Sequence, residues 1–163
     1  MRTRPFGRLA GLVATMTTAA LVIPPSQAQS APQVLRVGTY HGIAGQFSSI
    51  QAAVDAAQPG DWILVAPGDY KEWGSMDPAA SAGVWITTPD IHLRGMNRNT
   101  VIVDGSALKA RPCASGAKNQ ILGPTDASGN PVGANGIEVY KASGVSIENL
   151  TVCNYLMTAY GGN

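Results

Sequence analysis

The chain has 163 residues, of which 19 are glycine and 11 are proline, and only 13% are charged. So many turn-forming residues favour a β protein with short connections and disfavour a disordered chain or a long solvent-exposed helix. The net charge of +1 disfavours a basic nucleic-acid-binding protein, and no nucleic-acid partner is expected.

The first 28 residues have the features of a secretory signal sequence. Arg2, Arg4 and Arg8 precede an apolar run over 9–23, and small residues ending at Ala28 offer a cleavage site. A membrane anchor is the weaker alternative, because the run is shorter than the roughly 20 apolar residues that a spanning helix needs. Cleavage would leave eight basic and ten acidic residues, a net charge of −2. We therefore expect a secreted protein, exported by a bacterial route, with no membrane anchor after cleavage.

The sequence contains two cysteines, Cys113 and Cys153. In an exported protein these residues can form a disulfide, which would attach the Gly/Pro-rich inserted loop 105–135 to a later strand. Two buried free thiols are the alternative. No metal site is predicted, because neither cysteine has a neighbouring Cys or His pair of the kind that binds zinc.

The region after the signal sequence begins with a polar linker over 29–46, in which Val34–Val37 is a candidate edge strand. A short helix follows. Ser48 precedes Gln51 by three residues, which is the spacing of a capping box, and apolar residues then recur at helical intervals until Pro59-Gly60. The helix is mostly alanine on its apolar face, so we expect it to lie flat against an apolar surface.

Short apolar runs separated by turns then continue to the end of the chain. The predicted strands are 62–65, 84–86, 91–93, 101–103, 137–139, 145–147 and 150–152. Asn149 alone separates the last two, which is enough to bend a chain but not to reverse it, and Asn accepts left-handed backbone geometry. Three bends in one sense form a coil, whose interior would receive alternate side chains: Ile137, Val139, Val145, Ile147, Leu150 and Val152.

The most specific segments are the helix over 47–57, the turn Pro59-Gly60-Asp61 and the run Pro67-Gly68-Asp69-Tyr70. Together they resemble the N-terminal module of the right-handed parallel β-helix superfamily, the pectate lyase and pectin lyase-like fold. The resemblance implies an all-β fold, a right-handed parallel β-helix or solenoid with a short N-terminal capping helix. Residues 47–163 would form its first coils. It also implies that the chain is the N-terminal part of a longer protein, which we expect to be monomeric.

This superfamily includes pectin- and uronate-active enzymes as well as non-enzymatic surface proteins. The resemblance therefore implies a secreted protein that acts on or binds an extracellular polysaccharide. A non-catalytic surface or structural protein is the alternative. An enzyme would be a polysaccharide lyase, a glycoside hydrolase or a carbohydrate esterase. No catalytic residues are assigned, because the outward carboxylates, Glu138 and Asp104, are scattered. No cofactor is evident, and Ca²⁺ is expected only for a uronate lyase.

Four polar side chains are candidates for contact with a polysaccharide. His92 and Arg94 alternate with apolar residues on one predicted strand, and Glu138 and Tyr140 do so on another, so all four are expected to face outward. The alternative interpretation is an ordinary solvated face. The sequence also holds three tryptophans, Trp62, Trp73 and Trp85. They could stack on sugar rings, but packing beneath the loop or the helix is favoured.

Overall fold

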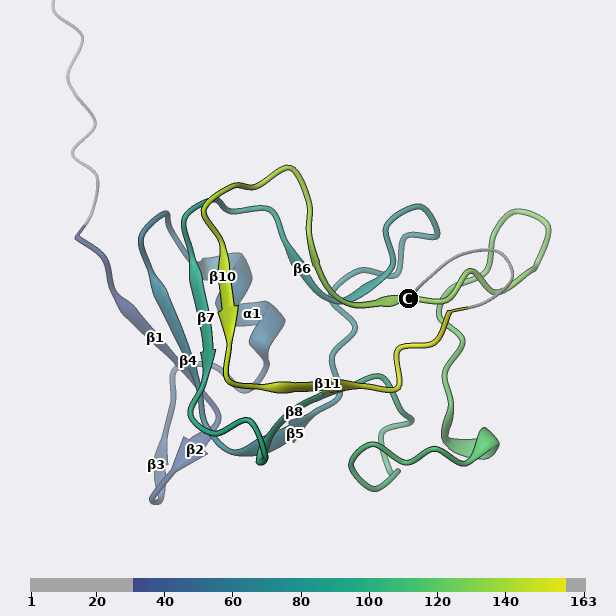
Figure 1. The fold of residues 1–163 in the computed structure, drawn as a ribbon, viewed down its shortest axis with the longest axis horizontal. Coiled ribbons are helices and arrows are strands. Elements are labelled where there is room, and N and C mark those ends of the chain that lie inside the picture. Colours follow the sequence, from purple (N-terminus) through teal and green to yellow (C-terminus); the bar gives the residue numbers. More distant parts are fainter. Residues whose placement is uncertain (1–30, 158–163) are drawn as a thin grey trace, which may run out of the picture. The chain divides into compact units, whose positions relative to one another are not determined.

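The computed structural model describes residues 31–157, so the predicted signal sequence over 1–28 lies outside the described part. The first sheet consists of four parallel strands in the order β1 (Val34–Val37), β4 (Trp62–Val65), β7 (His92–Gly95) and β10 (Ser146–Glu148). Figure 1 shows these strands side by side, with α1 (Ile50–Ala56) between this sheet and β6. Neighbouring strands of the first sheet are therefore never consecutive in the chain.

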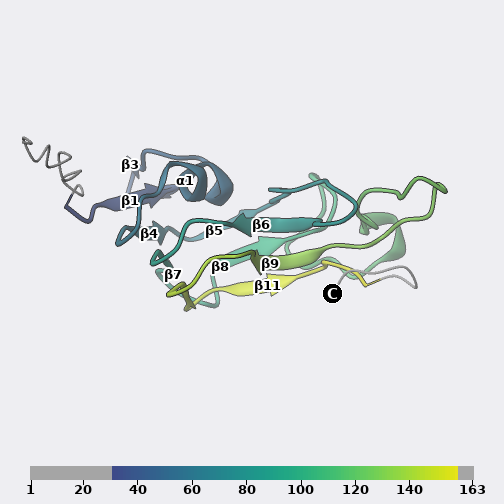
Figure 2. The same ribbon diagram turned by 90° about the horizontal axis from the view of Figure 1, so that it is seen from above.

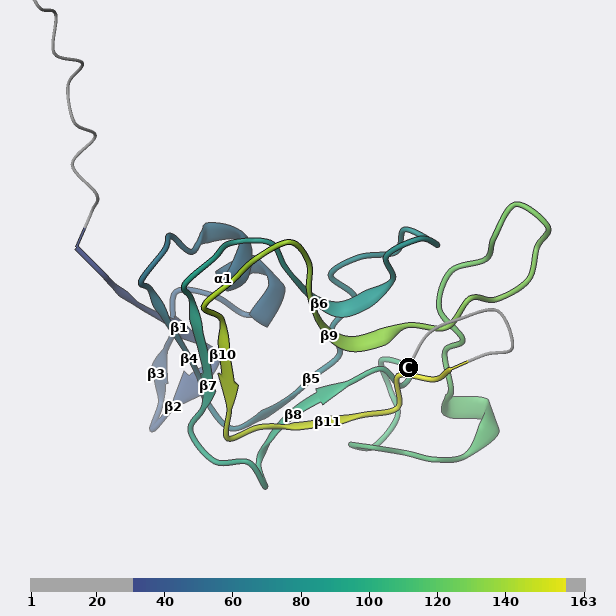
Figure 3. The same cartoon turned by 45° about the horizontal axis from the view of Figure 1, so that its top comes forward.

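Two further parallel sheets and one antiparallel pair complete the described strands (Figures 2 and 3). The second sheet has the order β11 (Thr151–Cys153), β8 (Val101–Asp104), β5 (Gly68–Tyr70), and the third pairs β6 (Ala82–Ile86) with β9 (Asn135–Val139). β2 (Thr39–Tyr40) and β3 (Ile43–Ala44) form the antiparallel hairpin. Between β8 and β9 lies the short 3₁₀-helix η1 (Ala117–Asn119).

The prediction of an all-β right-handed parallel β-helix is wrong for this structure. The described residues form several separate short sheets together with one α-helix, and one of these sheets is antiparallel. A solenoid needs coils that repeat at a steady interval. Here His92 and its neighbour Ser146 are 54 residues apart, because the segment around η1 intervenes, and the repeat seen between the earlier strands is lost. The short apolar runs predict the strands, and the inserted loop 105–135 is also expected, but these signals do not show that the strands divide among several separate sheets.

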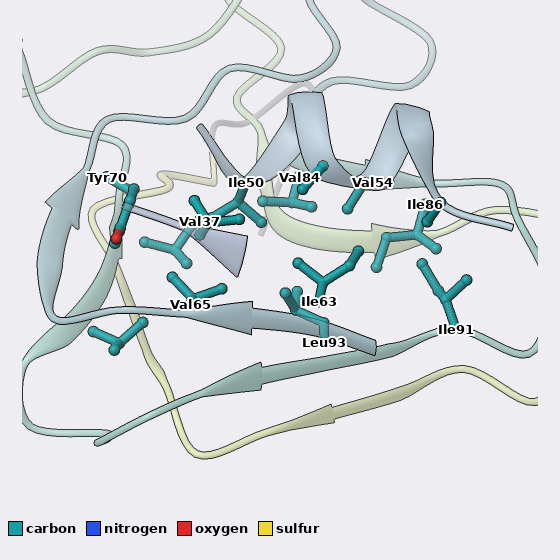
Figure 4. Close-up of a cluster of buried hydrophobic side chains, with 14 of the residues drawn as sticks. Val37, Ile50, Val54, Ile63, Val65, Tyr70, Val84, Ile86, Ile91 and Leu93 are labelled. Atoms are coloured by element: carbon teal, nitrogen blue, oxygen red, sulfur yellow. The ribbon is translucent and has the colours of Figure 1, made fainter. Parts of the chain in front are cut away.

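The core lies between α1 and the strands of the parallel sheets. Ile50 and Val54 of α1 face Ile63, Leu93 and other inward side chains, as Figure 4 shows. These inward residues are the alternate positions of each strand, and nearly all are fully buried. The helix predicted from its apolar face is therefore present, and it packs on an apolar surface.

The helix begins one residue later than the capping-box spacing predicts. Ser49 is the N-cap, and its hydroxyl accepts a hydrogen bond from the backbone N–H of Ala52. The buried carboxylate of Glu72 accepts from the N–H groups of Ile50 (2.6 Å) and Gln51 (3.2 Å). With Ser49 as the N-cap, Gln51 is the second helical residue and not the third, and its side chain bonds to the backbone of Trp85.

The bend between β10 and β11 has the predicted form. Asn149 adopts a left-handed backbone conformation (φ 58°), and its side-chain amide donates to the carbonyl of Gly95 (2.7 Å). Any side chain at position 95 would collide with the backbone carbonyl of Asn149, so glycine is required where the two turns meet.

Cys113 and Cys153 form a disulfide, as the sequence predicted. It attaches the irregular segment between β8 and β9 to the last residue of β11.

Candidate functional site

The outer face of the first sheet carries two rows of side chains, one from each alternate position of its strands. The parallel register aligns Val34, Trp62, His92 and Ser146 in one row and Arg36, Leu64, Arg94 and Glu148 in the other. Neighbouring parallel strands lie about 4.8 Å apart, so each row is a continuous ladder across the sheet. We call these eight residues the outer ladder.

Trp62 and His92 form the aromatic centre of the outer ladder. Their rings are stacked, with centroids 4.4 Å apart and an interplanar angle of 15°. His92 Nδ1 lies 2.8 Å from the hydroxyl oxygen of Ser146. Trp62 is 38% exposed, so part of its side chain meets solvent. The expectation that Trp62 packs beneath a loop or the helix is therefore wrong, because its strand position points outward.

The second row of the outer ladder carries charge. Arg94 Nη1 lies 3.0 Å from Glu148 Oε2, and both side chains are about half exposed. Arg36 is also exposed, and its guanidinium is held by the side-chain oxygen of Gln46 (3.4 Å). An exposed ion pair contributes little to stability, so Arg94 can exchange Glu148 for another carboxylate at low cost.

A hollow of about 130 Å³ adjoins the outer ladder beside the β2–β3 hairpin. Its lining is mostly apolar, with these members: Arg36, Val37, Tyr40, Ile43, Ala44, Gly45, Leu64, Ala66 and Met96. Arg36 and Leu64 belong to both the hollow and the outer ladder, so the two features form one continuous surface. The sequence did not indicate this hollow, because the hairpin that forms one wall contains only two residues per strand.

The structure separates the four predicted contact residues into two groups. His92 and Arg94 lie together on β7, whereas Glu138 lies on β9 of the third sheet and Tyr140 directly after it. Tyr140 stacks on Trp85 at 4.8 Å, and the Lys141 ammonium lies 4.7 Å from the Tyr140 ring. Glu138 is half-buried and accepts a hydrogen bond from Asn135. The two groups do not form one surface, because they belong to different sheets.

A buried ionic cluster lies at the end of β8, where the sequence suggested an outward carboxylate. Asp104 is fully buried, and its carboxylate contacts the Lys71 ammonium at 2.5 Å. Lys71 also contacts Asp69 (2.9 Å) and the Ser106 hydroxyl (2.9 Å). The Asp104 carboxylate accepts from the backbone of Ser106 and Cys113. Every charge in this cluster is therefore paired, which fits a structural role.

Acid should weaken the fold through Asp104. Burial alone would raise its pKa, but the hydrogen bonds from Lys71, Ser106 and Cys113 outweigh burial and lower the pKa to about 2. The native state therefore binds the proton less tightly than the unfolded chain, so the stabilisation is present above about pH 4 and lost as pH falls toward 2. Between about pH 6 and pH 2 we expect Asp104 to account for a loss of about 2 kcal/mol. Urea unfolding of the wild type and of Asp104→Asn at both pH values measures this difference; an equal loss in both proteins would contradict it.

Two further observations bear on the site. Among residues 31–157, no cluster of three or more His, Cys, Asp or Glu side chains is placed to hold a metal ion. Within the same residues, no helix has the length and apolar character needed to cross a membrane.

The chain matches no protein-family model, no curated protein and no solved structure.

Proposed function

We propose that the outer ladder binds an acidic extracellular polysaccharide. The observation that carries this proposal is the stacked pair of the exposed Trp62 and the half-buried His92, within a row of side chains that crosses four strands. Secretion is part of the same proposal, and the arginine-rich, apolar leader supports it.

The aromatic row suits the faces of sugar rings. A flat ring that is rigidly held and partly exposed can stack on an apolar sugar face at small entropic cost, and Tyr and Trp are favoured at such wet surfaces. His92 holds the Trp62 ring in place from one side. The Ser146 hydroxyl and the His92 ring then offer hydrogen-bonding groups beside the platform.

The charged row suits uronate carboxylates. Arg36 and Arg94 occupy the same row as Leu64, with two strand spacings between them. A guanidinium binds a carboxylate with two parallel hydrogen bonds, which gives both strength and orientation. Glu148 pairs with Arg94 in the free protein, so an acidic polymer must displace it. Salt screens the attraction between the carboxylates of the polymer and the two arginines, so we expect affinity to fall as salt rises.

We expect Trp62→Ala to weaken binding of polygalacturonate by about tenfold or more, since lost stacking and lost apolar contact together exceed about 1.4 kcal/mol. Isothermal titration calorimetry on the full chain measures the loss. Trp85→Ala is the matched control, because Trp85 stacks on Tyr140 of the third sheet and should leave affinity unchanged.

The charge requirement is tested in the same titration. A neutral polymer such as dextran should bind more weakly than polygalacturonate, and Arg94→Gln should reduce both the affinity and its dependence on salt. Equal loss in Trp62→Ala and Trp85→Ala would refute this location of the site. If the protein binds neither polymer, the alternative is favoured, a non-catalytic surface or structural protein.

A further inference from the structure

The hollow beside the β2–β3 hairpin combines apolar walls with a single charge. It has a volume of about 130 Å³, and Arg36 is the one charged residue among the described residues that line it. The apolar lining includes Leu64 of β4 and Met96, which follows β7, together with Tyr40 and Ile43 of the hairpin. An apolar cavity of about 150 Å³ takes up benzene, so this hollow has room for a hydrocarbon group of about six carbon atoms.

The Arg36 side chain brings an unpaired positive charge to the hollow. Its Nε donates to Gln46 Oε1 (3.4 Å), and the backbone N–H of Arg36 donates to the same oxygen (2.8 Å). The ion pairs within residues 31–157 involve Lys71 and Arg94, and none of them includes Arg36. A guanidinium without a carboxylate partner can bind the carboxylate of a ligand through charge-assisted hydrogen bonds.

The hairpin leaves apolar side chains exposed beside this charge. Ile43 is 65% exposed and Tyr40 is 46% exposed, although both line the hollow and are paired with each other across the hairpin. Large apolar side chains that are exposed together mark a binding surface more often than isolated ones do. A ligand in the hollow would cover part of both side chains.

The wall that the hairpin forms is held in place in the free protein. The N–H of Gly45 donates to the carbonyl of Gly38 (2.6 Å), and the N–H of Gly38 donates to the carbonyl of Phe47 (2.8 Å). A side chain at position 45 would collide with the backbone carbonyl of Arg36, so glycine lets the hairpin approach β1 closely. The hollow is therefore formed before a ligand binds, which lowers the cost of binding.

We propose that the hollow binds a small apolar carboxylic acid. The carboxylate pairs with Arg36, and the hydrocarbon group lies between Leu64, Met96 and the hairpin. A neutral hydrocarbon would leave the Arg36 charge without a partner, and a polar anion such as sulfate would leave the apolar lining in contact with water. A molecule that has both groups matches the whole hollow.

This site does not depend on the proposed polysaccharide binding. Arg36 belongs to both surfaces, so the acid and the polymer should compete for it, but the acid can be titrated without polymer. Trp62→Ala should weaken polymer binding and leave acid binding unchanged, because Trp62 is not among the residues that line the hollow. The two proposals can therefore fail separately.

Titration of the full chain with hexanoate, followed by NMR of ¹³C-labelled methionine methyl groups, tests the proposal. The Met96 signal, assigned with Met96→Leu, should shift and saturate, whereas Met76, which is 50% exposed and outside the hollow, should not shift. Hexanol has the same chain without the charge, and acetate has the charge without the chain. Each should bind at least about fivefold more weakly than hexanoate.

Two substitutions at exposed positions separate the charged and apolar parts of the site. Arg36→Gln should weaken hexanoate binding about fivefold without changing hexanol binding, and Ile43→Ser should weaken the binding of both. Arg94→Gln is the matched control, because Arg94 lies on the outer ladder and does not line the hollow. The methyl spectrum without ligand shows whether each variant keeps its native fold.

Three results would overturn the proposal. The first is the absence of a saturable shift of the Met96 signal with hexanoate. The second is equal affinity for hexanoate and hexanol, which would mean that Arg36 does not bind the carboxylate. The third is an equal loss of hexanoate affinity in folded Arg36→Gln and Arg94→Gln, which would mean that the acid binds outside the hollow.

Discussion

Asp104→Ala should lower the free energy of unfolding by about 3–5 kcal/mol, the range for breaking a buried ion pair. The change leaves the nearly buried Lys71 ammonium with only the partly exposed Asp69 as a charged partner. It also removes the acceptor for the N–H groups of Ser106 and Cys113, and unpaired buried donors add to the cost. Urea unfolding near neutral pH, followed by circular dichroism, measures the effect.

Glu148→Gln is the control for this prediction, because it breaks the exposed Arg94–Glu148 pair on the same fold. We expect a change below about 1 kcal/mol, since exposed ion pairs contribute little. Similar effects of the two substitutions would show that the Asp104 carboxylate is not held in a buried, paired state.

Removal of the disulfide by Cys113→Ser with Cys153→Ser should cost about 4 kcal/mol in the chain-entropy estimate for a loop of 40 residues. The bond restricts the unfolded chain and holds the irregular segment beside β11. Comparison of urea midpoints for the oxidised wild type and the double variant measures the loss.

Reducing agent provides the control for the disulfide prediction. It should shift the wild type toward the midpoint of the double variant and leave the double variant unchanged. A loss below about 1 kcal/mol would mean that the segment is held mainly by other contacts. The N–H bond from Cys113 to Asp104 is such a contact, so the disulfide and Asp104 changes should not be additive.

Local sequence signals predicted the local structure well. Apolar spacing and a hydroxyl near the start located α1, although its N-cap is Ser49 and not Ser48, and Glu72 accepts from the first backbone N–H of the helix. The strands fall near the predicted apolar runs, and Asn149 forms the expected bend. The disulfide is also confirmed. These features depend on residues close in sequence or on the presence of a single cysteine pair.

The fold and the candidate site depend on contacts that the sequence does not display. The solenoid was wrong because short apolar runs do not reveal how strands divide among separate sheets. Asp104 occupies a strand end that alternation alone assigned to the surface, and Lys71 reaches it from 33 residues away. The row that joins Trp62, His92 and Ser146 exists only through the strand register. Its residue types were visible in the sequence, but their neighbours were not.

Polysaccharide binding by the outer ladder is tested most directly by the three tryptophan side chains, which report from three different surroundings. In ¹⁵N-labelled protein, each indole N–H gives its own NMR signal, assigned with single Trp→Phe variants. Titration with galacturonate oligosaccharides should shift the Trp62 signal, because that ring lies exposed on the outer ladder. Trp73, packed on Tyr155, and Trp85, stacked on Tyr140, should not shift. Shifts confined to Trp73 or Trp85, or no shift at saturating oligosaccharide, would contradict the proposed site.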